Sequence, residues 1–236
     1  MLMEPLRRLI RPVVDFVYPP VCLLCDGNLG PGQSAVCSGC WNSFHRISPD
    51  HPVWCEIRDK LCGDGVVEDI YSCYLFEKDG ALQNAVHLLK YRGIRSVGVR
   101  LGEEIGRGCA ALWSGGRPDL LIPVPLHKRK KRERGYNQSD LLAQGVSGTA
   151  GVPVAAGLLR RSRYTESQTL LGLGERRENV EGAFSLAGAG RPGLAGRSVL
   201  LIDDVITTGS TLRACAAVLR RGGAEHVCAA SAALAQ

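Results

Sequence analysis

The chain has 236 residues, of which 45% are hydrophobic and 22% are charged. This composition predicts a folded protein of one ordinary domain plus a small accessory, and it excludes disordered, collagen-like and membrane-embedded chains. The net charge is +6, and the run KRKKRER at 128–134, with six cations and one glutamate, accounts for +5 of it. A single dense cluster favours a local polyanion, such as a phosphate group, or an acidic partner over a broad nucleic-acid-coating face.

Residues 1–20 (MLMEPLRRLIRPVVDFVYPP) carry five charged side chains among their apolar residues. They lack the continuous apolar stretch of a secretory signal, and we expect an N-terminal helix that docks on the following domain. No apolar run elsewhere approaches the ~20 residues that span a bilayer. We therefore expect a cytoplasmic protein without membrane insertion, in which paired cysteines indicate metal binding before disulfides.

Two CxxC pairs, Cys22 with Cys25 and Cys37 with Cys40, are separated by eleven residues. Four thiolates at this spacing are typical of a tetrahedral structural Zn²⁺ site. Metal binding would supply folding energy to residues 21–65, which are rich in Cys, Gly and Pro and too poor in periodic apolar residues to build a core. A thioredoxin-like redox pair is the alternative, although neither pair opens a helix after a strand.

The other cysteines carry weaker signals. Cys55 and Cys62 are a single widely spaced pair, so the sequence leaves open whether they bind metal. The remaining four, at 73, 109, 215 and 228, fall on predicted strands and helices, and we interpret them as small buried apolar residues.

Strand-like and helix-like patterns alternate over residues 66–236. Strands are expected at 70–76, 120–124, 158–160, 199–202 and 226–233, and helices at 82–91, 97–113, 136–146, 175–180 and 210–221. This order predicts an α/β domain whose parallel sheet is covered by helices on both faces. Ligands of such sheets bind beyond the carboxyl ends of the strands, so the segments after 124 and after 202 are the candidate site.

The strand at 199–202 leads into Asp203 and Asp204, and the sequence TTGST follows at 207–211. Paired carboxylates at the end of a buried strand can accept hydrogen bonds from a diol. The turn offers backbone N–H groups, hydroxyls and a helix N-terminus to a phosphate. Together these groups suit a sugar phosphate. A helix-capping Asp-rich turn is the alternative, and it explains Ser210 but not the apolar strand aimed at adjacent carboxylates.

The sequence VLLIDDVITTGSTL at 199–212 resembles the 5-phosphoribosyl-1-pyrophosphate (PRPP) signature of type I phosphoribosyltransferases. The resemblance implies that fold for residues 66–236. It also implies that Asp203 and Asp204, assigned as catalytic, hold the ribose hydroxyls and that residues 207–211 bind the 5-phosphate. The implied PRPP-binding set is Asp203, Asp204, Val205, Thr207, Thr208, Gly209, Ser210 and Thr211. In this family Mg²⁺ bridges the ribose hydroxyls and pyrophosphate, as suits an ion that keeps substrate oxygens as ligands.

Further motifs extend the resemblance over nearly the whole chain and narrow it to the ComF family. They are VDFVYPPVC at 14–22, HLLKYRG at 87–93, PVPLH at 123–127, RGYNQ at 134–138, and Gln168-Thr169 with the residues around 176–184. ComF proteins are amidophosphoribosyltransferase-like and are associated with natural transformation, in which imported single-stranded DNA is handled on the cytoplasmic side. The resemblance implies a competence helicase and a DNA-processing protein that loads recombinase as partners.

By position, the segment after the second predicted strand resembles a pyrophosphate loop. Its residues are Val124, Pro125, Leu126, His127 and Lys128. Nearby cations would stabilise departing pyrophosphate while the anomeric carbon becomes cationic. Six cations exceed what one pyrophosphate requires, so contact of the 128–134 run with single-stranded DNA or a protein stays open.

Residues 160–174 lack periodicity and lie where the family has a mobile loop that closes over the reaction. The candidates there for substrate contact are Arg163, Thr165, Gln168 and Thr169.

Three functions remain open. The leading hypothesis is a PRPP- and Mg²⁺-binding protein that acts in DNA uptake and transfers phosphoribose to an unidentified acceptor. The alternative is a non-catalytic adaptor that binds single-stranded DNA or a competence helicase through the zinc module and the basic run. The third is a salvage or biotin-pathway enzyme with the same signature. The sequence identifies neither the acceptor nor the oligomeric state.

Overall fold

A computed structural model describes residues 19–109, 116–161, 182–187 and 193–235. The chain divides into two compact units, residues 1–44 and 45–236. Three predictions lie wholly or almost wholly outside the described residues: the N-terminal helix, the short helix at 175–180, and the loop candidates Arg163, Thr165, Gln168 and Thr169. Within the described part of the chain, no helix has the length and apolar character needed to cross a bilayer.

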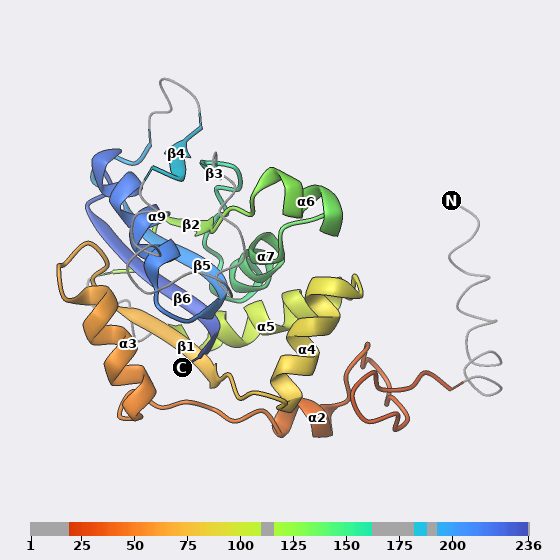
Figure 1. The fold of residues 1–236 in the computed structure, drawn as a ribbon. Coiled ribbons are helices and arrows are strands. Elements are labelled where there is room, and N and C mark those ends of the chain that lie inside the picture. Colours follow the sequence, from red (N-terminus) through yellow and green to blue (C-terminus); the bar gives the residue numbers. More distant parts are fainter. Residues whose placement is uncertain (1–18, 110–115, 162–181, 188–192, 236) are drawn as a thin grey trace. The chain divides into compact units, whose positions relative to one another are not determined.

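The elements alternate along the larger unit (Figure 1). Helix α2 (Ser38–Asn42) is in the smaller unit. The described helices of the larger unit are α3 (Pro52–Cys62), α4 (Ala81–Tyr91), α5 (Arg95–Gly108), α6 (Lys128–Arg134), α7 (Gln138–Ala150) and α9 (Ser210–Arg221). The strands are β1 (Ile70–Leu75), β2 (Leu120–Pro123), β3 (Leu159–Arg161), β4 (Phe184–Leu186), β5 (Ser198–Ile206) and β6 (His226–Leu234). All five predicted strands are present, whereas α2, α3, α6 and β4 were not predicted.

Four strands form a parallel sheet in the order β1-β6-β5-β2, and β3 pairs with β4 in a separate antiparallel ribbon. Alternate residues of a strand point to opposite faces, and Val199 and Leu201 of β5 belong to the core that α3 and α9 complete. Helices α5 and α7 pack against the other face (Figure 1). The predicted fold class, a parallel sheet covered on both faces, is confirmed.

Helices α5 and α7 pack closely because glycines lie between them. A Cβ on Gly102 would come within 2.0 Å of the Leu142 carbonyl oxygen, and one on Gly145 within 2.1 Å of the Val99 carbonyl oxygen. Neither distance is compatible with a side chain, so the two backbones approach each other only at glycine. This contact seats α7 against β2 and β5, where its first turn reaches the end of the sheet.

Helix α3 departs from the expectation that residues 21–65 lack a core. His51 caps it, with Nδ1 accepting a hydrogen bond from the Val53 N–H at 3.2 Å, and Pro52 is its first residue. Its buried residues, Val53, Trp54, Ile57 and Leu61, join the core beneath the sheet. The smaller compact unit ends at Phe44, and α3 belongs to the larger one.

Candidate functional site

The two carboxylates lie near the carboxyl end of β5 and have different partners. Ser139, in the first turn of α7, donates its hydroxyl to Asp203 Oδ1 at 3.1 Å. The Asp204 backbone N–H donates to the same oxygen at 2.9 Å. Asp204 is buried, and its carboxylate forms an ion pair with the ammonium of Lys90, at the end of α4. Each carboxylate is thus held by a different helix.

These surroundings shift the pKa values of the two carboxyl groups in opposite directions. Burial and the neighbouring Asp204 charge raise the pKa of Asp203 to about 7. Burial by itself would also raise the pKa of Asp204, but the Lys90 ammonium outweighs it and holds that pKa below its usual value. Near neutral pH, Asp204 is therefore an anion, while Asp203 lies close to its titration point.

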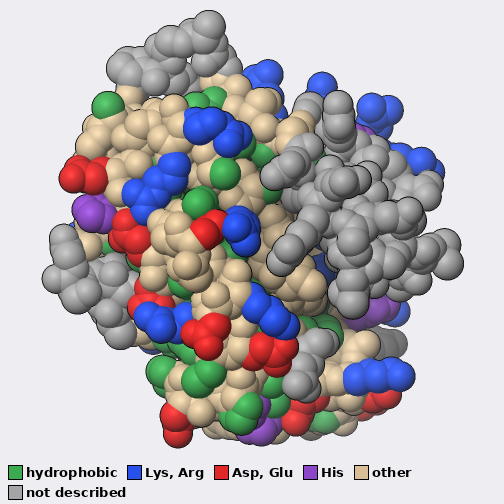
Figure 2. Space-filling view, turned by 60° about the vertical axis from the view of Figure 1, so that its left-hand side comes forward, with side chains coloured by type: hydrophobic (Ala, Val, Ile, Leu, Met, Phe, Trp, Pro, Cys, Tyr) green, Lys and Arg blue, Asp and Glu red, His purple; other side chains and the backbone are tan. Residues whose placement is uncertain are grey.

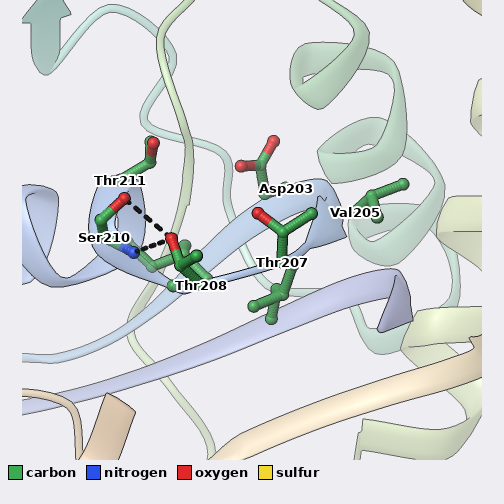
Figure 3. Close-up of a pocket in the computed structure, with 9 residues that line it drawn as sticks. Asp203, Val205, Thr207, Thr208, Ser210 and Thr211 are labelled. Atoms are coloured by element: carbon green, nitrogen blue, oxygen red, sulfur yellow. Dashed lines mark hydrogen bonds between the residues drawn. The ribbon is translucent and has the colours of Figure 1, made fainter. Parts of the chain in front are cut away.

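The loop after β5 encloses a pocket lined by Asp203 and residues 205–212 (Figure 3). Gly209 adopts a left-handed conformation, with φ +70°, and precedes α9 without a side-chain cap. Thr208 Oγ1 accepts a hydrogen bond from the Ser210 N–H at 3.4 Å and donates to Ser210 Oγ at 3.1 Å. Thr207 and Thr208 are exposed, so the loop presents hydroxyls and a helix N-terminus to an anion.

The segment 124–128 starts beside this loop. Strand β2 pairs with β5, with Pro123 opposite Ile202, and the Val124 N–H donates to the Ile202 carbonyl oxygen at 2.9 Å. Asn137 is buried and donates through Nδ2 to the Val124 carbonyl oxygen at 3.0 Å. The structure therefore brings the first residue of the predicted pyrophosphate loop next to the carboxylate pair. Pro125 and Leu126 follow half-buried.

The basic run is helix α6, a structure that the sequence analysis left unassigned. His127 caps it by accepting a hydrogen bond from the Arg129 N–H at 3.2 Å, and Gly135 ends it in a left-handed conformation. Arg129 pairs with Glu133 at 3.1 Å, one turn away. These local contacts offset the repulsion between the like charges of the run.

Helix α6 has a half-buried face and an exposed face. Lys130 and Arg134, one turn apart, are half-buried, whereas Lys128, Arg129, Lys131, Arg132 and Glu133 are exposed. Burial, together with Arg161, Arg134 and Lys90, lowers the pKa of Lys130. Lys90 on α4, Arg134 on α6 and Arg161 on β3 therefore lie within electrostatic range of Lys130, and these three cations also act on the carboxylate pair.

Sequence reasoning missed three residues of this arrangement. Lys90 lies within the HLLKYRG motif but was assigned no role. Ser139 follows RGYNQ and is completely buried, although it is polar. Arg161 is on β3, and the Asp203 charge acts on its guanidinium. Their position within or directly after a recognised motif is the only sequence signal that pointed to the first two.

In the smaller unit, Cys22, Cys25, Cys37 and Cys40 bring their four sulfur atoms within 4.8 Å of one another. Two pairs of sulfur atoms, Cys22 with Cys40 and Cys25 with Cys37, are 3.8 Å apart. That spacing is the edge, about 3.8 Å, of a tetrahedron with metal–sulfur bonds of about 2.3 Å. Backbone N–H groups of Leu24 and Cys37 point at Cys22 Sγ, as suits a thiolate. The donor set fits structural Zn²⁺.

The other cysteines lie apart from this cluster. Cys55 is exposed and Cys62 is half-buried on α3, and among the described residues the four-sulfur group is the one set arranged to hold a metal. Cys73, Cys109 and Cys215 are buried, as expected, and Cys228 is half-buried.

Comparison with known proteins places this architecture in a family. Residues 137–236 match the phosphoribosyl transferase domain family, and residues 13–71 match the double zinc ribbon domain family. Over 215 residues the chain is 42% identical to Competence protein F of Haemophilus influenzae, which covers 87% of this chain and 93% of that protein. The chain belongs to the ComF family.

Two further relatives agree with this assignment. Competence protein ComFC of Bacillus subtilis is 26% identical over 215 residues, which are 88% of this chain and 81% of that protein. The DNA utilization protein YhgH of Escherichia coli (strain K12) is 38% identical over 110 residues, 47% of each chain. The ComF relationship and the parallel sheet together make the larger unit a type I phosphoribosyltransferase-like domain, as predicted.

Proposed function

We propose that this ComF protein binds PRPP at the carboxyl end of β5 and acts in DNA uptake. The observation that carries the proposal is the combination, at one edge of the sheet, of a carboxylate pair, a hydroxyl-rich loop and a group of four cations. A ribose diol needs acceptors, and its 5-phosphate and pyrophosphate need donors and positive charge. One sugar carrying both anionic groups uses all three features.

In this assignment Asp203 and Asp204 accept hydrogen bonds from the ribose hydroxyls, and residues 207–211 bind the 5-phosphate. Lys130, Arg134 and Arg161 lie beside the segment 124–128 and face the pyrophosphate. If transfer occurs, an acceptor forms a bond to the anomeric carbon, the bond to pyrophosphate breaks with its electron pair, and the acceptor loses a proton. The cations stabilise the charge that develops on the leaving group.

Mg²⁺ would neutralise part of the pyrophosphate charge and orient its oxygens. The protein groups fit an ion held mainly by substrate. Asp204 is already occupied by Lys90, and Asp203 carries a proton for part of the time near pH 7, so the pair does not form a carboxylate cage.

Titration calorimetry of PRPP with Mg²⁺ tests the binding site. We expect saturable heat from the wild-type protein and its loss from the Asp203→Asn/Asp204→Asn double variant, with circular dichroism checking that the variant is folded. Absence of heat from the wild type, or equal heat from the folded variant, would overturn the PRPP assignment. Pyrophosphate release with candidate bases and amines then separates an enzyme from a PRPP-binding scaffold.

A second function, as an adaptor, is favoured by the outer face of α6. Lys128, Arg129, Lys131 and Arg132 are exposed. Figure 2 shows a face of the molecule on which basic and acidic side chains are interspersed. We propose that this face binds single-stranded DNA or an acidic surface of a competence helicase or DNA-processing protein. The names of the relatives, competence and DNA utilization proteins, support a role in handling DNA.

Two adjacent lysines of α6 separate the two functions. Lys130→Gln removes a half-buried charge and Lys131→Gln an exposed one, with the same change in net charge. We expect Lys130→Gln to weaken PRPP binding and Lys131→Gln to weaken binding of a single-stranded oligonucleotide, with a shallower salt dependence. Oligonucleotide affinity that neither substitution changes would remove α6 as the DNA contact.

A further inference from the structure

Lys90 is aimed at the carboxylate pair by the packing of its helix. The apolar face of α4, formed by Leu82, Ala85, Val86, Leu88 and Leu89, is buried. Tyr136 donates its hydroxyl to the carbonyl oxygen of Leu89, which anchors the last turn of the helix to the segment before α7. Lys90 follows directly, and its side chain is 25% exposed. Its ammonium is therefore fixed beside Asp204 rather than free in solvent.

A contribution to folding stability does not by itself explain the ion pair between Lys90 and Asp204. Both partners lose most of their water, with Asp204 only 7% exposed, and the desolvation of two charges offsets much of their attraction. An apolar pair of similar volume would fold as well. The Lys90 ammonium, unlike an apolar group, can hold the Asp204 carboxylate as an anion in one orientation next to Asp203.

We propose that Lys90 is the positioning residue of the diol site: its ammonium holds Asp204 as an oriented anion, so that the carboxylate pair retains a charged hydrogen-bond acceptor at neutral pH. The inference rests on the proposed PRPP function and adds a residue to it. Asp203 has a different role, because its partner is the uncharged Ser139 hydroxyl.

The charged and titratable groups around the pair come from several elements. They are Lys90 on α4, Arg134 on α6, Arg161 on β3 and Cys215 on α9, and Lys130 on α6 lies within range of the three cations. Among the described side chains, Lys90 is the one that forms an ion pair with Asp204. Without its ammonium, burial still acts to raise the pKa of Asp204, and only the smaller effects of the Asp203 hydrogen bond and the Arg134 charge oppose it. The pair would then keep a proton at a pH where the wild-type pair has lost it.

The pH profile of PRPP binding distinguishes positioning from simple charge attraction. In Lys90→Met we expect affinity to fall by about tenfold or more near pH 7 and to recover partly near pH 8.5, because the retained proton is then lost. Lys90→Arg should keep a wild-type profile. Lys130→Met is the matched control: it removes a nearby cation that does not pair with Asp204, so we expect a similar loss at every pH.

Carbon-13 NMR of aspartate-labelled protein, without PRPP, gives an independent test. We expect the Asp204 carboxyl to titrate at higher pH in Lys90→Met than in the wild type and to be unchanged in Lys130→Met. If Lys90→Met does not fold, Lys90→Gln replaces it. Unchanged Asp204 titration, or a loss of affinity that is equal at all pH values, overturns the inference. Absence of PRPP binding by the wild type overturns the proposed function, and the NMR titration still decides the role of Lys90.

Discussion

Leu61, in the last turn of α3, lies against Gly209, from which α9 begins. A Cβ on Gly209 would come within 3.0 Å of Leu61 Cδ1 and 3.1 Å of Cδ2. The glycine that shapes the proposed phosphate-binding loop is therefore supported by a helix that the sequence analysis assigned to the zinc module. The loop and residues 45–65 belong to one structural unit.

Gly209→Ala should weaken PRPP binding and destabilise the protein by roughly 1–2 kcal/mol, because a side chain is strained at φ +70° and also meets Leu61. Gly157→Ala is the matched control, since Gly157 has φ +75° and nothing within 4 Å of an added Cβ. We expect Gly157→Ala to cost stability alone. Chemical denaturation and calorimetry measure both effects, and equal PRPP affinity in the two variants would contradict the proposed role of the loop.

The adjacent aspartates should respond to amide substitution with opposite signs. Asp204→Asn leaves the Lys90 ammonium without its partner, so we expect destabilisation of roughly 2 kcal/mol near neutral pH. Because the folded-state pKa of Asp204 is lowered, this contribution is present above the ordinary aspartate range and is lost as the pH falls through the folded-state value.

Asp203→Asn should instead stabilise the protein at pH 8, by about 2 kcal/mol, and have little effect near pH 4. The folded-state pKa of Asp203, about 7, is above its unfolded value, so ionisation of Asp203 opposes folding as the pH rises through 7. Urea denaturation at several pH values measures both variants. If Asp203→Asn and Asp204→Asn destabilise the protein equally and with the same pH dependence, the two carboxyl groups do not have the opposite pKa shifts that the structure indicates.

Local sequence patterns were sufficient to predict most of the fold. The apolar run at 199–202 identified β5, and the observed strand continues to Ile206 because Val205 and Ile206 pair with β6. The predicted helix 210–221 coincides with α9. Helix α6 was missed because a run of like charges disfavours a helix, although its His127 cap and Gly135 end were local signals.

The partners of the site could not be predicted from local patterns. Asp203 and Asp204 are adjacent, but Ser139 and Lys90 approach them from α7 and α4, more than sixty residues away in the sequence. Such contacts follow from the order of strands in the sheet and from the glycine contact between α5 and α7, which the spacing of residues in one sequence does not specify. The four zinc ligands were predictable because their spacing is local.

Cys40→Ser should abolish stoichiometric zinc binding, whereas Cys55→Ser should leave it intact. Cys40 Sγ belongs to the four-sulfur cluster, 3.8 Å from Cys22 Sγ, and Cys55 is exposed on α3 outside it. Elemental analysis should find one zinc ion per chain in the wild type and in Cys55→Ser. Because structural zinc contributes folding energy, we also expect Cys40→Ser to make residues 19–44 sensitive to proteolysis. Zinc retained at full stoichiometry in Cys40→Ser would contradict the assignment.

Two glycines of α7, three residues apart, should respond oppositely to alanine. In Gly145→Ala the added Cβ would lie 2.1 Å from the Val99 carbonyl oxygen, so α5 and α7 must separate, and we expect a loss of roughly 2–4 kcal/mol. Gly148 is exposed with nothing within 4 Å, so Gly148→Ala should stabilise the helix by about 0.5 kcal/mol. Because Ser139 is on the same helix, Gly145→Ala should also weaken PRPP binding, whereas Gly148→Ala should not. Thermal melts and calorimetry on both proteins check this, and a Gly145→Ala protein as stable as Gly148→Ala would mean that α7 is not held against α5 as closely as described.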